Sequence, residues 1–136
     1  MKILIIPIII FLLFLVACDK HNNPPTLSEI SVPDSLAKGD TLLYLVSALA
    51  IDPDGAGDID SVYFIVTRPD STSNGIHFAM NDRGELGDSV PGNNRYSTGI
   101  QAPAPQSQSG NYTFTFYARD KHGNNSNNPS AIITAY

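Results

Sequence analysis

After its first 26 residues the chain alternates between short apolar segments and clusters of turn residues. Residues 111–119 show the pattern most clearly, because Tyr112, Phe114, Phe116 and Ala118 occupy every second position. A period of two is typical of a strand with one buried face, and no long stretch has the 3.6-residue period of a helix. The pattern predicts seven strands, at residues 27–32, 41–51, 61–67, 76–80, 96–100, 111–119 and 130–136.

The N-terminal segment has a different pattern. Lys2 precedes an unbroken apolar run of 15 residues, 3–17, that contains Pro7. A membrane-spanning helix needs about 20 apolar residues, so this run is too short for one. It matches the apolar region of a secretory signal peptide. The sequence therefore predicts a signal peptide at 1–17, a short polar linker at 18–26 and one domain at 27–136.

The apolar run ends in the sequence LVAC, at residues 15–18, which resembles the lipobox of bacterial lipoproteins. The resemblance implies cleavage before Cys18, a diacylglyceryl group on its thiol and an acyl chain such as palmitate on its new amine. Cys18 is the only cysteine in the chain, so it has no disulfide partner. Two or three acyl chains would hold the protein firmly on a membrane. The alternative interpretation is a plain secretory signal followed by a chance cysteine.

Charge and composition limit the classes of partner that the sequence favours. The chain has 13 Asp and Glu against 8 Lys and Arg, which disfavours nucleic acid and anionic lipid surfaces. All but two of the acidic residues are Asp, which favours turns over helix interiors. The resemblance to a lipoprotein implies a location in the bacterial cell envelope. We expect the outer membrane or cell surface rather than the inner membrane.

Seven strands in about 110 residues favour an all-β, immunoglobulin-like β-sandwich. The segment GNYTFTFYA, at residues 110–118, resembles strand F of immunoglobulin domains, whose pattern is G-x-Y-x-C-x-A. The resemblance implies that Tyr112 forms a tyrosine corner, with its hydroxyl bound to the backbone of the preceding loop. Phe114 stands in place of the cysteine, and the chain has no Trp. The similarity is therefore to disulfide-free fibronectin type III, cadherin-like and bacterial immunoglobulin-like modules.

Carboxylates gather in three of the predicted loops. In a seven-stranded sandwich the loops 52–60, 81–95 and 120–129 lie at one end. They carry Asp52, Asp54, Asp58, Asp60, Asp82, Glu85, Asp88 and Asp120.

The segment 52–60, DPDGAGDID, raises the question of calcium. It is not an EF-hand, because Ala56 and Tyr63 stand at the fifth and twelfth positions and the flanking segments are strands. One interpretation is a calcium site assembled from two loops, with the ligands Asp52, Asp54, Asp58 and Asp120. The other is turn chemistry alone, since Asp caps its own turns and Gly allows positive φ.

No motif predicts catalysis. His21, His77 and His122 are widely spaced and have no cysteine partner, and no nucleophile or phosphate-binding motif is present. The sequence predicts a protein that is not an enzyme and requires no cofactor. It would be a membrane-anchored binding or accessory module that contacts an envelope protein or glycan through its Asp- and Gly-rich loops, and not nucleic acid. The alternative is a structural or assembly subunit whose last strand pairs with a neighbour's sheet edge.

Overall fold

Two β-sheets make up the structure, a computed structural model that describes residues 22–85 and 90–136. The first sheet has the strand order β1-β3-β6, and the second has the order β2-β8-β7-β4-β5. A 3-10 turn occupies Ala56–Asp58. The strands are β1 (Thr26–Ser31), β2 (Ser35–Leu36), β3 (Tyr44–Ile51), β4 (Ile59–Thr67), β5 (Phe78–Met80), β6 (Arg95–Ile100), β7 (Gly110–Asp120) and β8 (Ser130–Ala135).

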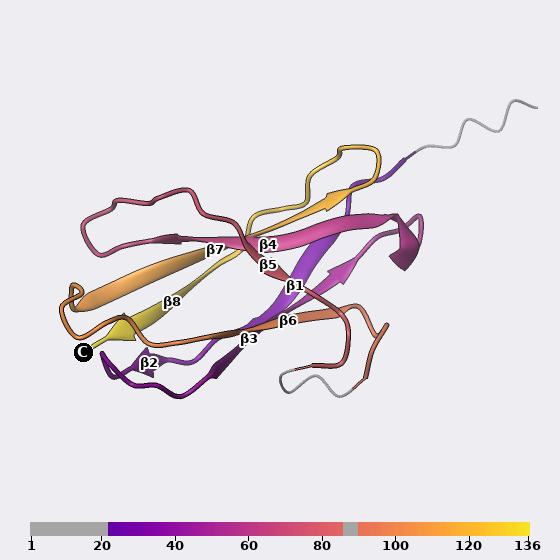
Figure 1. Cartoon of the computed structure of the whole chain (residues 1–136). Helices are drawn as coiled ribbons and strands as arrows, with labels where there is room; N and C mark the ends of the chain where they lie inside the picture. The colour runs from indigo at the N-terminus through magenta and orange to yellow at the C-terminus, as the bar shows by residue number, and fades with distance from the viewer. Residues whose placement is uncertain (1–21, 86–89) are drawn as a thin grey trace, which may run out of the picture.

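The two sheets lie as the layers of a sandwich, with the strands running along its length (Figure 1). Strand pairs in the described residues are antiparallel, apart from β2, which pairs with the end of β8 in parallel. All seven predicted strands are present with small shifts at their ends, and the two-residue β2 is an eighth. The predicted all-β, immunoglobulin-like sandwich is therefore confirmed.

Alternating side chains of the second sheet fill the space between the layers. On β7, the residues Tyr112, Phe114, Phe116 and Ala118 are buried, as the period of two predicts. The Phe64 ring lies 5.1 Å from the Phe114 ring and 5.6 Å from the Phe116 ring, measured between centroids. Each buried Phe contributes about 1.5–3 kcal/mol relative to an exposed one. Aromatic packing thus forms the centre of this sheet's inner face.

Tyr112 has the geometry that the resemblance to strand F implied. Its hydroxyl donates a hydrogen bond of 2.9 Å to the backbone oxygen of Gln108, in the loop before β7. Its ring is buried with the core residues. The residue joins the β6–β7 loop to the sandwich interior.

Two predicted strands are shorter than the sequence indicated. The strand expected at 41–51 begins only at Tyr44, because Asp40 accepts hydrogen bonds from the Leu42 N–H and the Tyr44 hydroxyl and holds the chain in a turn. The strand expected at 76–80 begins at Phe78, because Asn74 accepts from the Ile76 N–H in a similar turn. The expectation that 41–51 is central is confirmed, since β3 lies between β1 and β6. Its second face is only partly covered, because Leu45 and Ile51 are exposed while Ser47, between them, is buried.

The last residues of the predicted linker belong to the folded unit. Pro25 is fully buried, and β1 begins at Thr26. Cys18, the signal peptide at 1–17 and the first part of the linker lie outside the described residues. The described residues include no helix of the length and apolarity needed to cross a membrane.

Candidate functional site

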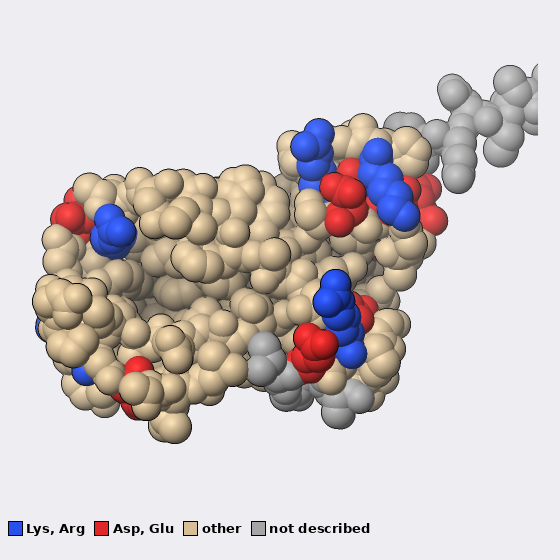
Figure 2. Space-filling view, viewed as in Figure 1, with Lys and Arg blue, Asp and Glu red and all other residues tan. Residues whose placement is uncertain are grey.

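The chain enters the sandwich at Asn22, at the end opposite to the C-terminus (Figure 1). We call this the tether end. The loop 52–58 lies there next to the turn after β7, because the Lys121 N–H donates to the Asp58 backbone oxygen over 2.8 Å. The loop 81–94 also reaches it, since the Ala50 N–H donates to the Asn94 backbone oxygen. The structure thus brings together the three loops that the sequence placed at one end, and charged side chains gather there (Figure 2).

Three of the predicted ligands form a compact cluster in the loop 52–58. One carboxylate oxygen from each of Asp52, Asp54 and Asp58 lies within 4.8 Å of the other two. The loop is shaped by its own bonds: the Asp52 side chain accepts from the Asp54 N–H over 2.8 Å, and the Asp52 backbone oxygen accepts from the Gly55 N–H. Gly55 has φ 115°, which favours glycine at the bend. Turn chemistry therefore builds the loop and gathers the carboxylates.

Asp52 differs from an ordinary turn aspartate. The residue is only 6% exposed, and its Oδ2 atom has no hydrogen-bond partner. Buried polar atoms are nearly always satisfied, because an unpaired one loses its hydration with no replacement. This oxygen is therefore the most unusual polar atom of the tether end.

Asp120, the fourth predicted ligand, lies beside the cluster with its oxygens already used. Oδ1 accepts from the N–H groups of His122 and Asn124, and Oδ2 accepts from the side-chain amides of Asn124 and Asn22. Burial by itself raises the pKa of Asp120, but the hydrogen bonds from Asn124, Asn22 and His122 outweigh it and hold the pKa below its ordinary value. Asp120 organises the turn after β7 and the incoming chain.

Sequence reasoning did not place His122 in the cluster. Its Nδ1 atom lies 3.2 Å from Asp58 Oδ2, and Asp58, Asp120 and His122 form a second group whose ligand atoms lie within 4.8 Å of one another. The topology contained the signal, because the turn after β7 must lie beside the loop 52–58. Asp58 is the residue that the two groups share.

The remaining predicted acids have other roles or positions. The Asp82 carboxylate accepts from the N–H groups of Gly92, Asn93 and Asn94 and closes its own loop. Asp60 is exposed on β4, and Glu85 is exposed in the loop. Asp88 lies outside the described residues.

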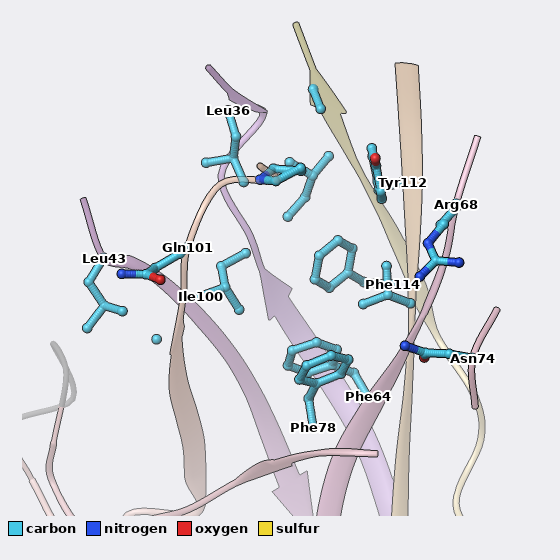
Figure 3. A pocket seen from close by; sticks show the side chains of 15 residues that line it. Leu36, Leu43, Phe64, Arg68, Asn74, Phe78, Ile100, Gln101, Tyr112 and Phe114 are labelled. Carbon is cyan, nitrogen blue, oxygen red and sulfur yellow. The ribbon is translucent and has the colours of Figure 1, made fainter. Parts of the chain in front are cut away.

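An apolar cleft of about 450 Å³ lies between the layers in the other half of the molecule, the cleft end. Figure 2 shows the hollow, with largely uncharged surface around it and a basic residue at its edge. The polar side chains that line it are those of Arg68, Asn74, Gln101 and Tyr112 (Figure 3). The apolar walls include Leu36, Leu43, Phe64, Phe78, Ile100 and Phe114. Its volume and lining are those of a ligand site, which the sequence analysis did not find.

The cleft exists because the two sheets separate beyond one bridge. Asn81, just after β5, and Ser97 on β6 exchange two backbone hydrogen bonds of 3.0 and 2.8 Å. Toward the cleft end no strand in the described residues continues this link, and Phe78 and Leu43 line the opening, 38% and 56% exposed. Both β5 and β6 are edge strands.

Three rings form a ladder on the outer face of the second sheet. Tyr63 stacks on His77 with 4.2 Å between centroids and on Tyr117 with 5.2 Å. Because the rings stack face to face, Tyr63 has no free flat face to offer. The ladder is cross-strand packing of the kind that stabilises sheets.

Similar folds are found among solved structures. No protein-family model and no curated protein matches the chain. The PKD domain of an M14-like peptidase from a Thermoplasmatales archaeon is 14% identical with a TM-score of 0.50, over 84% of this chain and 97% of that one. The SrpA adhesin of Streptococcus sanguinis is also 14% identical with a TM-score of 0.50, over 87% of this chain.

A third similar structure contains the fibronectin(III)-like modules of Clostridium thermocellum CbhA, 20% identical over 82% of this chain with a TM-score of 0.49. The chain spans 46% of that structure and 59% of the adhesin chain. At such identities a likeness establishes the fold alone. The described chain has the immunoglobulin-like β-sandwich fold.

Proposed function

We propose that this protein is a non-enzymatic binding module of the bacterial envelope, anchored by lipid on Cys18, that holds an apolar segment of a partner protein in its cleft. The LVAC sequence and the solitary cysteine support the anchor. The outer membrane or cell surface is the proposed location. The observation that carries the binding function is the open apolar cleft at the end away from the tether.

The positions of the two ends support this orientation. Cys18 lies four positions before Asn22, and an extended chain of that length reaches at most about 14 Å. A lipid on Cys18 therefore keeps the tether end close to the membrane. The 11-residue strand β7 spans the sandwich between the two ends, a length of about 36 Å. The Asp- and Gly-rich loops, which the sequence analysis favoured as the contact surface, then face the membrane, while the cleft is open to partners.

The chemistry of the cleft favours a protein segment over a glycan. Its walls are aliphatic and phenyl side chains, with few polar groups to bind sugar hydroxyls. The Tyr63 ladder offers stacked rings rather than a free flat platform. A peptide in extended conformation can place apolar side chains between Leu43 and Phe78 and pair with the edge of β5 or β6. Arg68 supplies a cation for an acidic group of that peptide.

Assembly through edge strands is the second candidate. The sequence analysis assigned it to the last strand, β8. The two-residue β2 pairs only with Thr134 and Ala135 of β8, so within the described residues the first part of β8 has no strand partner on that side. The outermost strands of the two sheets are β1, β2, β5 and β6. A second copy of the chain paired on β5 or β6 would give a solution mass that rises with concentration.

The anchor is tested by metabolic labelling with palmitate. We expect label on the wild-type chain, none on a Cys18→Ala variant, and release of that variant from the membrane fraction. An unlabelled wild-type chain that stays soluble after secretion would contradict the anchor without affecting the cleft.

The cleft is tested by photo-crosslinking in intact cells. A crosslinking residue in place of Ile76, two positions before Phe78, should give a discrete adduct whose mass shows one partner. The matched control replaces Ile132, which is 55% exposed on β8. Leu43→Asp should remove the Ile76 adduct. Identical adducts from both positions, or an adduct unaffected by Leu43→Asp, would contradict a partner in the cleft.

A further inference from the structure

The carboxylates of the loop 52–58 have the donor chemistry of a calcium site. Asp52, Asp54 and Asp58 place three hard oxygens within 4.8 Å of one another on a loop that bends at glycine. Calcium prefers such oxygens in flexible arrangements and completes its six to eight ligands with carbonyl groups and water. Zinc prefers nitrogen and sulfur ligands, which these three residues do not supply.

A second and independent observation is the unsatisfied oxygen of Asp52. The residue is 6% exposed, its Oδ1 accepts from the Asp54 N–H, and its Oδ2 has no partner. Within the described part of the chain, neither Asp52 nor Asp54 forms a salt bridge with Lys or Arg. A cation among the three carboxylates would satisfy the oxygen and relieve the repulsion between like charges.

The neighbouring group of Asp58, Asp120 and His122 is a poorer choice for an ion. The four hydrogen bonds of Asp120 use both of its oxygens, and His122 offers nitrogen, which calcium disfavours. The candidate ligands are therefore Asp52, Asp54 and Asp58. Asp120 stabilises the neighbouring turn and is not itself a ligand.

The same residues hold the incoming chain. The Asn23 N–H donates to Asp54 Oδ2 over 2.7 Å, and the Asn22 side chain donates to Asp120 Oδ2 over 2.9 Å. Asp58 is joined to the turn after β7 through the Lys121 N–H. A cation that holds Asp54 and Asp58 in place therefore also holds the groups that the N-terminal segment contacts.

We infer that Asp52, Asp54 and Asp58 bind Ca²⁺ and that the bound ion fastens the N-terminal segment, at Asn22 and Asn23, to the sandwich. The coupling is reciprocal: an ion that orders the segment binds more tightly when the segment is docked. The inference does not depend on lipid at Cys18 or on a partner in the cleft.

Calcium binding is tested by calorimetric titration and thermal melts of the full chain in detergent, with Ca²⁺ and with Mg²⁺ as the comparison ion. We expect one Ca²⁺ per chain and a higher melting temperature, since a ligand of the native state alone stabilises it. Asp52→Asn and Asp54→Asn keep side-chain shape and should weaken binding by roughly tenfold or more, since even outer-shell changes at metal sites cost that much.

The matched control is Asp60→Asn, which removes an equal charge from an exposed position outside the cluster and should bind like the wild type. No heat and superimposable melts for the wild-type chain would overturn the site. Equal loss of affinity in all three variants would show diffuse attraction rather than a site, and would overturn it too.

The fastening is tested by amide hydrogen exchange at Asn23, with Ca²⁺ and with a chelator. We expect slower exchange of the Asn23 N–H with Ca²⁺ in the wild type and in Asp60→Asn, and no change in Asp54→Asn. Calcium binding that leaves Asn23 exchange unchanged in the wild type would overturn the coupling.

Discussion

The two ends of the sandwich are built from the same strands but have opposite surfaces. At the tether end, backbone hydrogen bonds join the loops, and Asp120 is buried among four donors. At the cleft end the layers separate, and apolar side chains such as Leu43 and Phe78 remain exposed. A rigid core can therefore carry a polar, closed end and an apolar, open end, and each end can change without the other.

This comparison separates residues that stabilise the fold from residues that shape a surface. The tether end depends on satisfied polar groups, so a lost partner leaves a buried donor or acceptor. The opening of the cleft is formed by side chains such as Leu43 and Phe78 that are already in contact with water, so their replacement changes shape more than stability.

The largest expected effect comes from the core that the ends share. Phe116→Ala should lower the free energy of unfolding by about 3–5 kcal/mol, because the ring is fully buried. Phe78→Ala, at the opening of the cleft, should cost only about 1 kcal/mol, because the ring is partly exposed. Urea denaturation measures both. Equal losses would mean that the Phe78 ring stabilises the fold as much as the buried Phe116 ring does.

Asp120→Ala should have the next largest effect. It leaves the donors of Asn22, His122 and Asn124 without their acceptor. Asp70→Ala, at the cleft end, removes bonds that water replaces, because Asp70 is exposed. We expect a clear fall in the urea midpoint for the first variant and a small one for the second.

The pH dependence of the unfolding free energy in acid tests the contribution of the buried Asp120. The pKa of Asp120 is lower in the folded than in the unfolded chain. Its contribution is therefore present above the unfolded pKa, near 3.8, and is lost as the pH falls through the folded value. Asp120→Asn should flatten the dependence of unfolding free energy on pH below about 4. If the unfolding free energy of that variant depends on pH as in the wild type, other carboxylates cause the acid denaturation.

Gly99→Ala should alter the cleft with little effect on stability. An added Cβ would lie 2.6 Å from two Leu43 side-chain atoms, and Leu43 is exposed enough to move aside. We expect the unfolding free energy to change by less than about 1 kcal/mol and the crosslinking yield at Ile76 to change. A large loss of stability would show that Leu43 is fixed.

The smallest expected effect is at Asp70. The hydrogen bond from the Thr72 hydroxyl is the main reason that its pKa falls to about 2. Thr72→Val should raise this pKa, as an NMR titration of the carboxyl carbon would show. Because the group is exposed, the unfolding free energy at neutral pH should hardly change. An unchanged pKa would assign the shift to the Thr72 N–H and Gln108.

The sequence was sufficient for features that depend on local periodicity or on topology. Alternation at 111–119 located the inner face of β7, and the strand order required the loop 52–58 to lie beside Asp120. The tyrosine corner at Tyr112 followed from a resemblance over nine residues.

Other features depend on distances that no local pattern contains. The cleft is formed by Leu43 and Phe78, 35 positions apart, and by the separation of two sheets beyond the Asn81–Ser97 bridge. The four donors of Asp120 include Asn22, from the segment expected to be a free linker. Burial of Asp52 likewise depends on how the chain packs around the loop.

The antiparallel pairing of β1 with β3 has a mechanical consequence. Thr26, the first residue of β1, pairs with Ile51, and the pairing runs from there toward the cleft end. Tension between an N-terminal anchor and a partner in the cleft would pull along the strands, while the hydrogen bonds of an antiparallel ladder lie across them. The ladder would be loaded in shear, with its bonds sharing the force, instead of opening one bond at a time. Such a geometry suits a module that must stay folded while it is pulled.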